Sequence, residues 1–355
     1  LIRKDQWLAK PPRKWRRWLL VGGAIVLVPL FFVFGGFGYF FGTASQLRHE
    51  VVMPAPGLPD LVGDQASEYG RFLEEDQLSA ALVEQAFAEI RPQFDDVRVI
   101  FVPSWLSDTA VSSVSLGDSL GYMAGIYNWL DEAGINAQIA DVETEDTVAT
   151  NAARLSEIMA RVEGQVCFVT HSKGGLDLLE YLRKASARDR ARVRCWIAMQ
   201  APFKGSPVAD LATDVAGLPE TASVLLQALG GRGESLTDLT TQARMTYLSE
   251  NSSEIAGVMA EIEPICLASY VDHPDEYQRP TPWNYPALLW MHETGVPSDG
   301  LVAVRSAVEI CPQSLILEGL DHTAIVAPGV VAAIDQTALM KALMTLALRE
   351  PSREK

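Results

Sequence analysis

Residues 166–177 constrain the fold of this chain more than any other segment, because they predict a strand, a sharp turn and a helix in succession. The residues up to Thr170 are apolar or small, as in a strand buried inside a sheet. Ser172 stands at the apex of the turn, and Gly174 and Gly175 begin a helical pattern. Small residues suit a turn whose backbone is strained and crowded by neighbouring strands. Such a turn lifts the serine hydroxyl out of the sheet, beside the N-terminus of the helix.

Two polar residues follow this serine, each in a loop that contains glycine: Asp299 and then His322. Apolar runs at residues 265–271 and 314–317 predict strands before these loops. A hydroxyl at its ordinary pKa is a weak nucleophile, so it needs a base within hydrogen-bond reach. The base in turn needs a carboxylate that fixes its tautomer. The chain therefore offers Ser172 as nucleophile, Asp299 as orienting acid and His322 as base.

Other residues compete for these roles. The pair Asp299-Gly300 is also a common turn pair, and Asp321 adjoins His322. Side chains adjacent in sequence rarely face each other, so Asp299 is the preferred acid. The remaining histidines are His49, His171, His273 and His292. We expect His171 to pack or bond locally. His49 follows the uncharged segment 18–41, and His273 and His292 lie in a loop rich in Pro, Trp and Tyr before Asp299.

From residue 97 to about residue 330 the chain resembles the bacterial triacylglycerol lipases of the α/β-hydrolase superfamily. The resemblance is carried by residues 170–175, 200–210, 236–241 leading into Tyr247, and 298–302 with His322 after them. It implies an α/β-hydrolase fold, with a mostly parallel central sheet, helices on both faces and a lid-like helical insert. It also implies esterase or lipase activity through a catalytic triad of Ser172, Asp299 and His322, with little indication of which ester.

The chain departs from the lipase pattern near the oxyanion hole. Trp105 stands where the family usually has the glycine that donates a backbone N–H, and the second donor would be the N–H of Lys173. Thr170 replaces the first glycine of the usual Gly-x-Ser-x-Gly motif. We expect the Lys173 side chain to be solvated at the start of the helix, the alternative being a contact with an anionic group. Ala324 replaces a calcium-binding aspartate of the secreted lipases, so we expect no such calcium site. No other metal and no cofactor are expected.

Residues 18–41 predict a transmembrane helix, since these 24 residues contain no charge and can cross a hydrocarbon core of about 30 Å. Seven basic residues and one acidic residue precede them, which predicts a cytoplasmic N-terminus and a periplasmic or exterior hydrolase domain. A cleaved signal peptide is the alternative, but its apolar core would be shorter. Gly38 and Gly42 have the spacing of closely packed membrane helices, so a membrane-protein partner is a further expectation.

The predicted organisation follows from these features. The segments are a basic cytoplasmic tail (1–17), the transmembrane helix (18–41), an extracytoplasmic linker and helix (42–95), the hydrolase domain (96–348) with its lid or cap insert (206–262), and a charged tail (349–355). Within the third segment, residues 64–90 predict a helix with one apolar face.

Composition excludes some functions and leaves others open. The net charge of −16 argues against nucleic-acid binding. The four cysteines are spaced too widely for a zinc signature. Outside the cytoplasm they allow three disulfide pairings, but buried free thiols fit the pattern at least as well, so the sequence leaves the disulfide state open.

Two functional hypotheses remain. The first is a membrane-anchored serine hydrolase that acts on lipid or other acyl esters at the inner membrane, with acyl transfer as a narrower variant. The second is an accessory subunit of a membrane complex that keeps the fold with weak or no catalysis.

Overall fold

The computed structural model describes residues 53–61, 63–104, 123–214, 233–275, 284–326 and 334–348. The predictions for residues 18–41 and for Trp105 fall outside these ranges. Within the described ranges, no helix is long and apolar enough to cross a membrane.

A six-stranded parallel sheet forms the centre of the protein, with strand order β4-β3-β5-β6-β7-β8. Its strands are β3 (Val97–Val102), β4 (Ala137–Ile139), β5 (Gln165–His171), β6 (Val193–Met199), β7 (Ile265–Tyr270) and β8 (Gln313–Glu318). A separate two-stranded antiparallel sheet pairs β1 (Leu73–Glu74) with β2 (Gln77–Leu78). The expected α/β fold with a mostly parallel sheet is confirmed.

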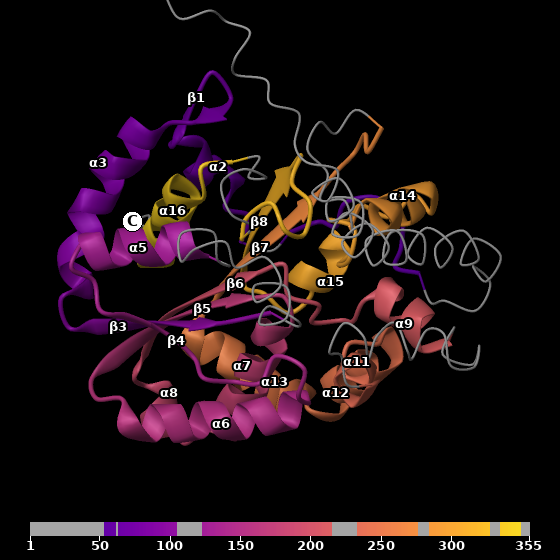
Figure 1. Ribbon diagram of the computed structural model, residues 1–355, viewed down its shortest axis with the longest axis horizontal. Coiled ribbons are helices and arrows are strands. Elements are labelled where there is room, and N and C mark those ends of the chain that lie inside the picture. The colour runs from indigo at the N-terminus through magenta and orange to yellow at the C-terminus, as the bar shows by residue number, and fades with distance from the viewer. Residues whose placement is uncertain are drawn as a thin grey trace, which may run out of the picture.

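Helices connect the strands and cover both faces of the sheet (Figure 1). The helices are α2 (Ala66–Gly70), α3 (Ala80–Ile90), the short 3-10 helix η2 (Arg91–Phe94), α5 (Ala124–Glu132), α6 (Val148–Arg161), α7 (Lys173–Lys184), α8 (Ala187–Arg190), α9 (Pro207–Asp214), α11 (Gly233–Thr237), α12 (Thr241–Glu250), α13 (Ser252–Ile262), α14 (Tyr285–Glu293), α15 (Val304–Val308) and α16 (Gln336–Leu348).

Two large apolar clusters lie on opposite faces of the sheet, because successive side chains of a strand point to opposite sides. Val99 and Phe101 of β3 belong to the cluster beneath α3, α5 and α16. Ile100 and Val102 belong to the cluster beneath α6, α7 and α13. The strands are therefore buried on both faces, which is why they read as continuous apolar runs in the sequence.

Residues 64–90 do not form the single helix that their apolar pattern predicts. A hairpin separates α2 from α3, with Glu75 and Asp76 as its two-residue loop. Both loop residues have positive φ, 49° and 61°, as the favoured two-residue turns require. The apolar residues on either side still face the core, so the spacing alone could not reveal the break.

The predicted insert at residues 206–262 contains α9, α11, α12 and α13 in its described parts. Ile255, Val258 and Met259 of α13 are buried in the same cluster as Leu176 of α7, so this helix belongs to the body of the domain. Residues 215–232 of this predicted lid or cap insert lie outside the described ranges.

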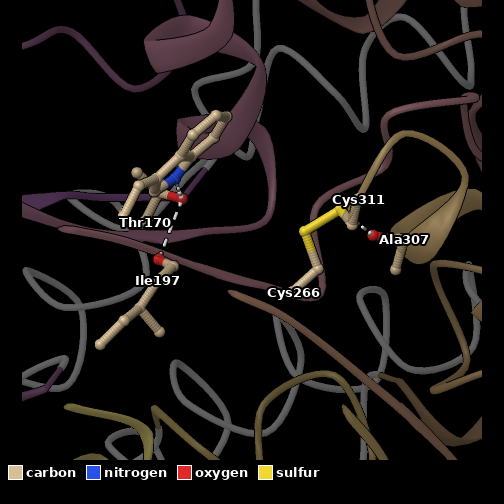
Figure 2. The surroundings of a disulfide bond; sticks show 6 residues. Thr170, Ile197, Cys266, Ala307 and Cys311 are labelled. Atoms are coloured by element: carbon tan, nitrogen blue, oxygen red, sulfur yellow. Dashed lines mark hydrogen bonds between the residues drawn. A yellow bond between two sulfur atoms is a disulfide. The ribbon is translucent and has the colours of Figure 1, made fainter. Parts of the chain in front are cut away.

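All four cysteines are paired in disulfides, a state that the sequence did not predict. Cys167 of β5 bonds to Cys195 of the adjacent β6, with their Cα atoms 4.6 Å apart. Cys266 of β7 bonds to Cys311, and the Cα atoms are 6.1 Å apart. Figure 2 shows the second bridge, with Cys311 Sγ 3.6 Å from the carbonyl oxygen of Ala307. The pairing depends on which strands are neighbours, and cysteine spacing does not reveal that.

Candidate active site

Ser172 occupies a strained turn between β5 and α7. Its backbone angles are φ 53° and ψ −128°, a conformation that L-residues rarely adopt. Its N–H donates to the carbonyl oxygen of Met199 at 2.9 Å, which ties the turn to the end of β6. The strand-to-helix turn predicted from the sequence is therefore present, with Ser172 at its apex.

The two glycines after the serine allow α7 to approach the sheet closely. A Cβ on Gly174 would lie 2.4 Å from the carbonyl oxygen of Val102 and 2.6 Å from that of Pro103. A Cβ on Gly175 would lie 2.5 Å from the Cβ of Ala201. Neither position has room for a side chain, so glycine is required for this packing.

Thr170 is accommodated where the usual motif has glycine. The side chain is fully buried, and its Oγ1 accepts a hydrogen bond from Trp196 Nε1 at 3.0 Å. The hydroxyl also lies 3.5 Å from the carbonyl oxygen of Ile197, as Figure 2 shows. Thr170 thus satisfies a buried indole N–H that glycine would leave without this acceptor.

Asp299 and His322 lie together, 23 residues apart in sequence. His322 Nδ1 is 2.8 Å from Asp299 Oδ2, and both side chains are buried. The second carboxylate oxygen, Asp299 Oδ1, accepts from the N–H groups of Leu301 and Val302 at 2.9 and 2.7 Å. The N–H of His322 donates to the main-chain oxygen of Asp299 at 2.9 Å. The carboxylate is therefore fixed on both of its oxygens, one of which faces the imidazole.

Asp321, the alternative acid, bonds to the backbone of its own loop. Its Oδ1 accepts from the backbone N–H groups of Thr323 and Ala324, both at 2.9 Å, and so supports the turn that carries His322. His273 and His292 are exposed, in contrast to the buried His322.

Asn284 contributes to the site although no sequence signal pointed to it. The side chain is buried, and its Nδ2 donates to the main-chain oxygen of Asp299 at 2.9 Å. Gly300, with φ of 100°, passes directly over this amide: a Cβ there would lie 2.7 Å from Asn284 Oδ1. The glycine thus lets the loop of Asp299 close against Asn284.

The Lys173 side chain is buried rather than solvated, so the expectation for it is wrong. Its Nζ lies 2.9 and 3.0 Å from the two carboxylate oxygens of Asp177, one turn further along α7. Asn151 Nδ2 of α6 donates to Asp177 Oδ2 at 2.9 Å. Burial raises the pKa of Asp177 to about 6, against the lowering effect of Lys173. The ammonium is held by Asp177 inside the protein.

The backbone of Lys173 remains the candidate oxyanion donor. Lys173 is the first residue of α7, and the first N–H groups of a helix have no acceptor within the helix. The N-terminal end of the helix also carries a partial positive charge.

His171 bonds locally, as expected. Its Nε2 lies 3.0 Å from Gln200 Oε1 and 3.1 Å from the carbonyl oxygen of His322. Burial, reinforced by the charge of His322, lowers the pKa of His171 to about 3, which keeps this ring neutral. Since Ser172 directly follows His171, the nucleophile candidate and the His322 loop meet at one edge of the sheet.

No family model matches the chain, and no curated protein sequence matches it. Among solved structures it is similar to a metagenomic carboxyl esterase, with a TM-score of 0.60 and 19% identity over 85% of this chain and 98% of that one. It is also similar to the mature form of a Bacillus licheniformis lipase, with a TM-score of 0.52 and 18% identity over 69% of this chain and 91% of that one. The chain therefore has the α/β fold found in these carboxyl esterases and lipases.

Proposed function

We propose that this protein is a serine hydrolase that cleaves carboxylic esters. The observation that carries the proposal is the contact of 2.8 Å between His322 Nδ1 and Asp299 Oδ2, at the sheet edge where Ser172 occupies its strained turn. A buried carboxylate fixed on a histidine is the arrangement that turns a nearby serine into a nucleophile.

The mechanism assigns one role to each residue. Ser172 Oγ attacks the acyl carbon while His322 removes the hydroxyl proton, and His322 then returns that proton to the departing alkoxide. Asp299 holds His322 in the tautomer with hydrogen on Nδ1 and stabilises its positive charge. The N–H groups of Lys173 and Trp105 would stabilise the oxyanion. Water then cleaves the acyl-serine by the same steps, releasing the acid and free Ser172.

We further propose that residues 18–41 anchor the enzyme in the inner membrane, with the hydrolase domain in the periplasm. The uncharged length of this segment and the basic residues before it support the proposal. The two disulfides are a second and independent support, because disulfides persist in oxidising compartments and are rare in the cytosol.

The position at which the chain after the proposed anchor enters the domain supports an active site that lies near the bilayer. Met53 packs against the same buried cluster as Leu301, two residues after Asp299. Arg305 Nη2 lies 3.5 Å from the carbonyl oxygen of Leu58, so the chain after Met53 stays on the side of the domain that carries Leu301 and Arg305. Twelve residue steps separate Phe41 from Met53, which reach about 40 Å at most. A domain of this size is about 50 Å across, which is more than the connection can reach. The side of the domain farthest from Met53 therefore cannot be the side that rests on the bilayer. Lipid esters of the same membrane are the substrates that suit this orientation.

Labelling with a fluorophosphonate probe tests the activity. We expect the full chain in mild detergent to be labelled, and the label to disappear in Ser172→Ala. Ser156→Ala, which changes an exposed serine of α6, is the matched control and should label fully. A folded wild-type protein without label would contradict the proposal and would favour an accessory subunit without catalysis.

A further inference from the structure

A buried hydrogen-bond network joins three strand ends to the loop that carries His322. Its centre is Gln200, the first residue after β6, whose side chain is fully buried. Gln200 Nε2 lies 2.5 Å from Ser269 Oγ of β7 and 3.2 Å from the carbonyl oxygen of Asp321. Gln200 Oε1 faces His171 Nε2 at 3.0 Å. The carboxamide therefore contacts β5, β7 and the His322 loop at the same time.

His171 makes the second link to that loop. The same Nε2 atom that faces Gln200 lies 3.1 Å from the carbonyl oxygen of His322. The two imidazole rings lie with their centroids 4.8 Å apart. Gln200 and His171 thus contact two successive carbonyl groups of the loop: Gln200 that of Asp321, and His171 that of His322.

The acceptors fix the direction of every bond in the network. A carbonyl oxygen can only accept, so the amide nitrogen of Gln200 must face Asp321, and its Oε1 must face His171. His171 Nε2 must then carry hydrogen, which it shares between Gln200 Oε1 and the carbonyl oxygen of His322. The low pKa of His171 agrees with this neutral form, and a neutral ring does not oppose a positive charge on His322.

The backbone of Gln200 shows that glutamine is retained here against a conformational preference. Its φ is 50°, in the left-handed region that favours glycine. A glycine would relieve the backbone but would remove all three side-chain contacts. Strained residues of this kind persist where the surrounding structure requires them, often at functional sites.

We infer that Gln200 and His171 are positioning residues, which hold the main chain of His322 so that its imidazole meets Ser172 and Asp299 correctly. This inference rests on the proposed function, since it assigns His322 as the base. Neither residue exchanges a proton with the substrate. They act through the loop, and a displacement of about 1 Å at a catalytic group can cost about 100-fold in rate.

The test uses the full chain in mild detergent and compares variants of His171 and Gln200 that keep or remove the hydrogen-bond donor to the His322 loop. His171→Gln places an N–H donor at a similar reach, whereas His171→Phe keeps the ring without a donor. We expect His171→Phe and Gln200→Gly to lower kcat about 100-fold with KM within about twofold. His171→Gln should retain most of the wild-type kcat. Gln200→Glu, similar in shape but unable to donate to Asp321 when ionised, should lose kcat as well.

A spectroscopic signal separates positioning from general stability. The Nδ1 proton shared between His322 and Asp299 should give a low-field proton NMR signal in wild type and in His171→Gln. We expect this signal to shift or broaden in His171→Phe, whatever the change in melting temperature. Folded His171→Phe and Gln200→Glu with wild-type kcat and an unchanged signal would overturn the inference. Absence of fluorophosphonate labelling in the wild type would overturn the proposed function itself. That result differs from one in which wild type and variants are all active with the same kcat, which would overturn only the inference.

Discussion

Ser172 and Gln200 occupy equivalent positions in the sheet, each as the first residue after one of two adjacent parallel strands. Both have positive φ, 53° and 50°. Each donates its N–H to a residue of the next strand: Ser172 to Met199 of β6 at 2.9 Å, and Gln200 to Leu267 of β7 at 2.7 Å. A residue with positive φ whose N–H bonds to the next strand therefore follows both β5 and β6, once as the nucleophile candidate and once as a residue that contacts the His322 loop.

The strained backbone at Ser172 predicts that a glycine there raises the stability of the protein although it abolishes activity. Glycine adopts positive φ without the cost of a Cβ, and a strained non-glycine residue costs about 1–3 kcal/mol. We expect Ser172→Gly to have a free energy of unfolding about 1 kcal/mol higher than Ser172→Ala, with both variants inactive. Denaturant unfolding of the two proteins measures this difference. A glycine variant less stable than the alanine variant would show that the turn carries no such strain.

The buried ion pair of Lys173 and Asp177 predicts a strong coupling between the two residues. Lys173→Met leaves a buried carboxylate without its cation, which costs about 3–5 kcal/mol of stability in comparable cases. We expect Lys173→Met/Asp177→Leu to lose less than the sum of the single variants, because it leaves no lone charge. A double-mutant cycle by denaturant unfolding measures this coupling. The exposed pair Arg161 and Glu157 of α6 is the control and should give a coupling near zero.

The neutral state of His171 predicts a loss of stability in acid. Its pKa is about 3 in the folded protein against an ordinary value of 6.5, so between these values only the unfolded chain binds the proton. Stability therefore falls as the pH drops below 6.5, by about 1.4 kcal/mol per pH unit, and His171 has no such effect above 6.5. Between pH 7.5 and pH 5, wild type should lose about 2 kcal/mol more than His171→Gln. Unfolding curves at both values check this, and equal losses would mean that His171 is protonated in the folded state.

The central part of the fold could be predicted because its signals are local. In residues 166–177 the apolar strand, the serine and the two glycines are adjacent in sequence, and the structure has β5, the turn and α7 there. The pairing of Asp299 with His322 was predicted from chain order, from the glycine-containing loops and from the resemblance to lipases, and the two side chains are in contact in the structure.

The remaining features depend on which distant segments become neighbours. Lys173 and Asp177 have the spacing of an ordinary surface pair on a helix, and they are buried because α6, α13 and the sheet pack around α7. Cys167 and Cys195 pair because β5 and β6 are adjacent. Gln200 begins the segment 200–210 that resembles the lipases, but its role could not be predicted, because its side-chain partners come from β5, β7 and the loop after β8.

If residues 18–41 form the proposed membrane anchor, the short connection between residues 41 and 53 predicts that the active site is held close to lipid esters of the same membrane. We propose inserting a 20-residue Gly/Ser spacer between Ala44 and Ser45, which lengthens the connection from 12 to about 32 steps. Effective concentration falls roughly as the −3/2 power of linker length, so hydrolysis of a lipid ester in the same vesicle should fall about fourfold. Hydrolysis of a soluble short-chain ester should not change, because Ser172, Asp299 and His322 are unaffected. The same spacer added after Lys355 is the control and should change neither rate. Equal rates on the lipid ester with and without the internal spacer would mean that the connection does not place the site at the bilayer.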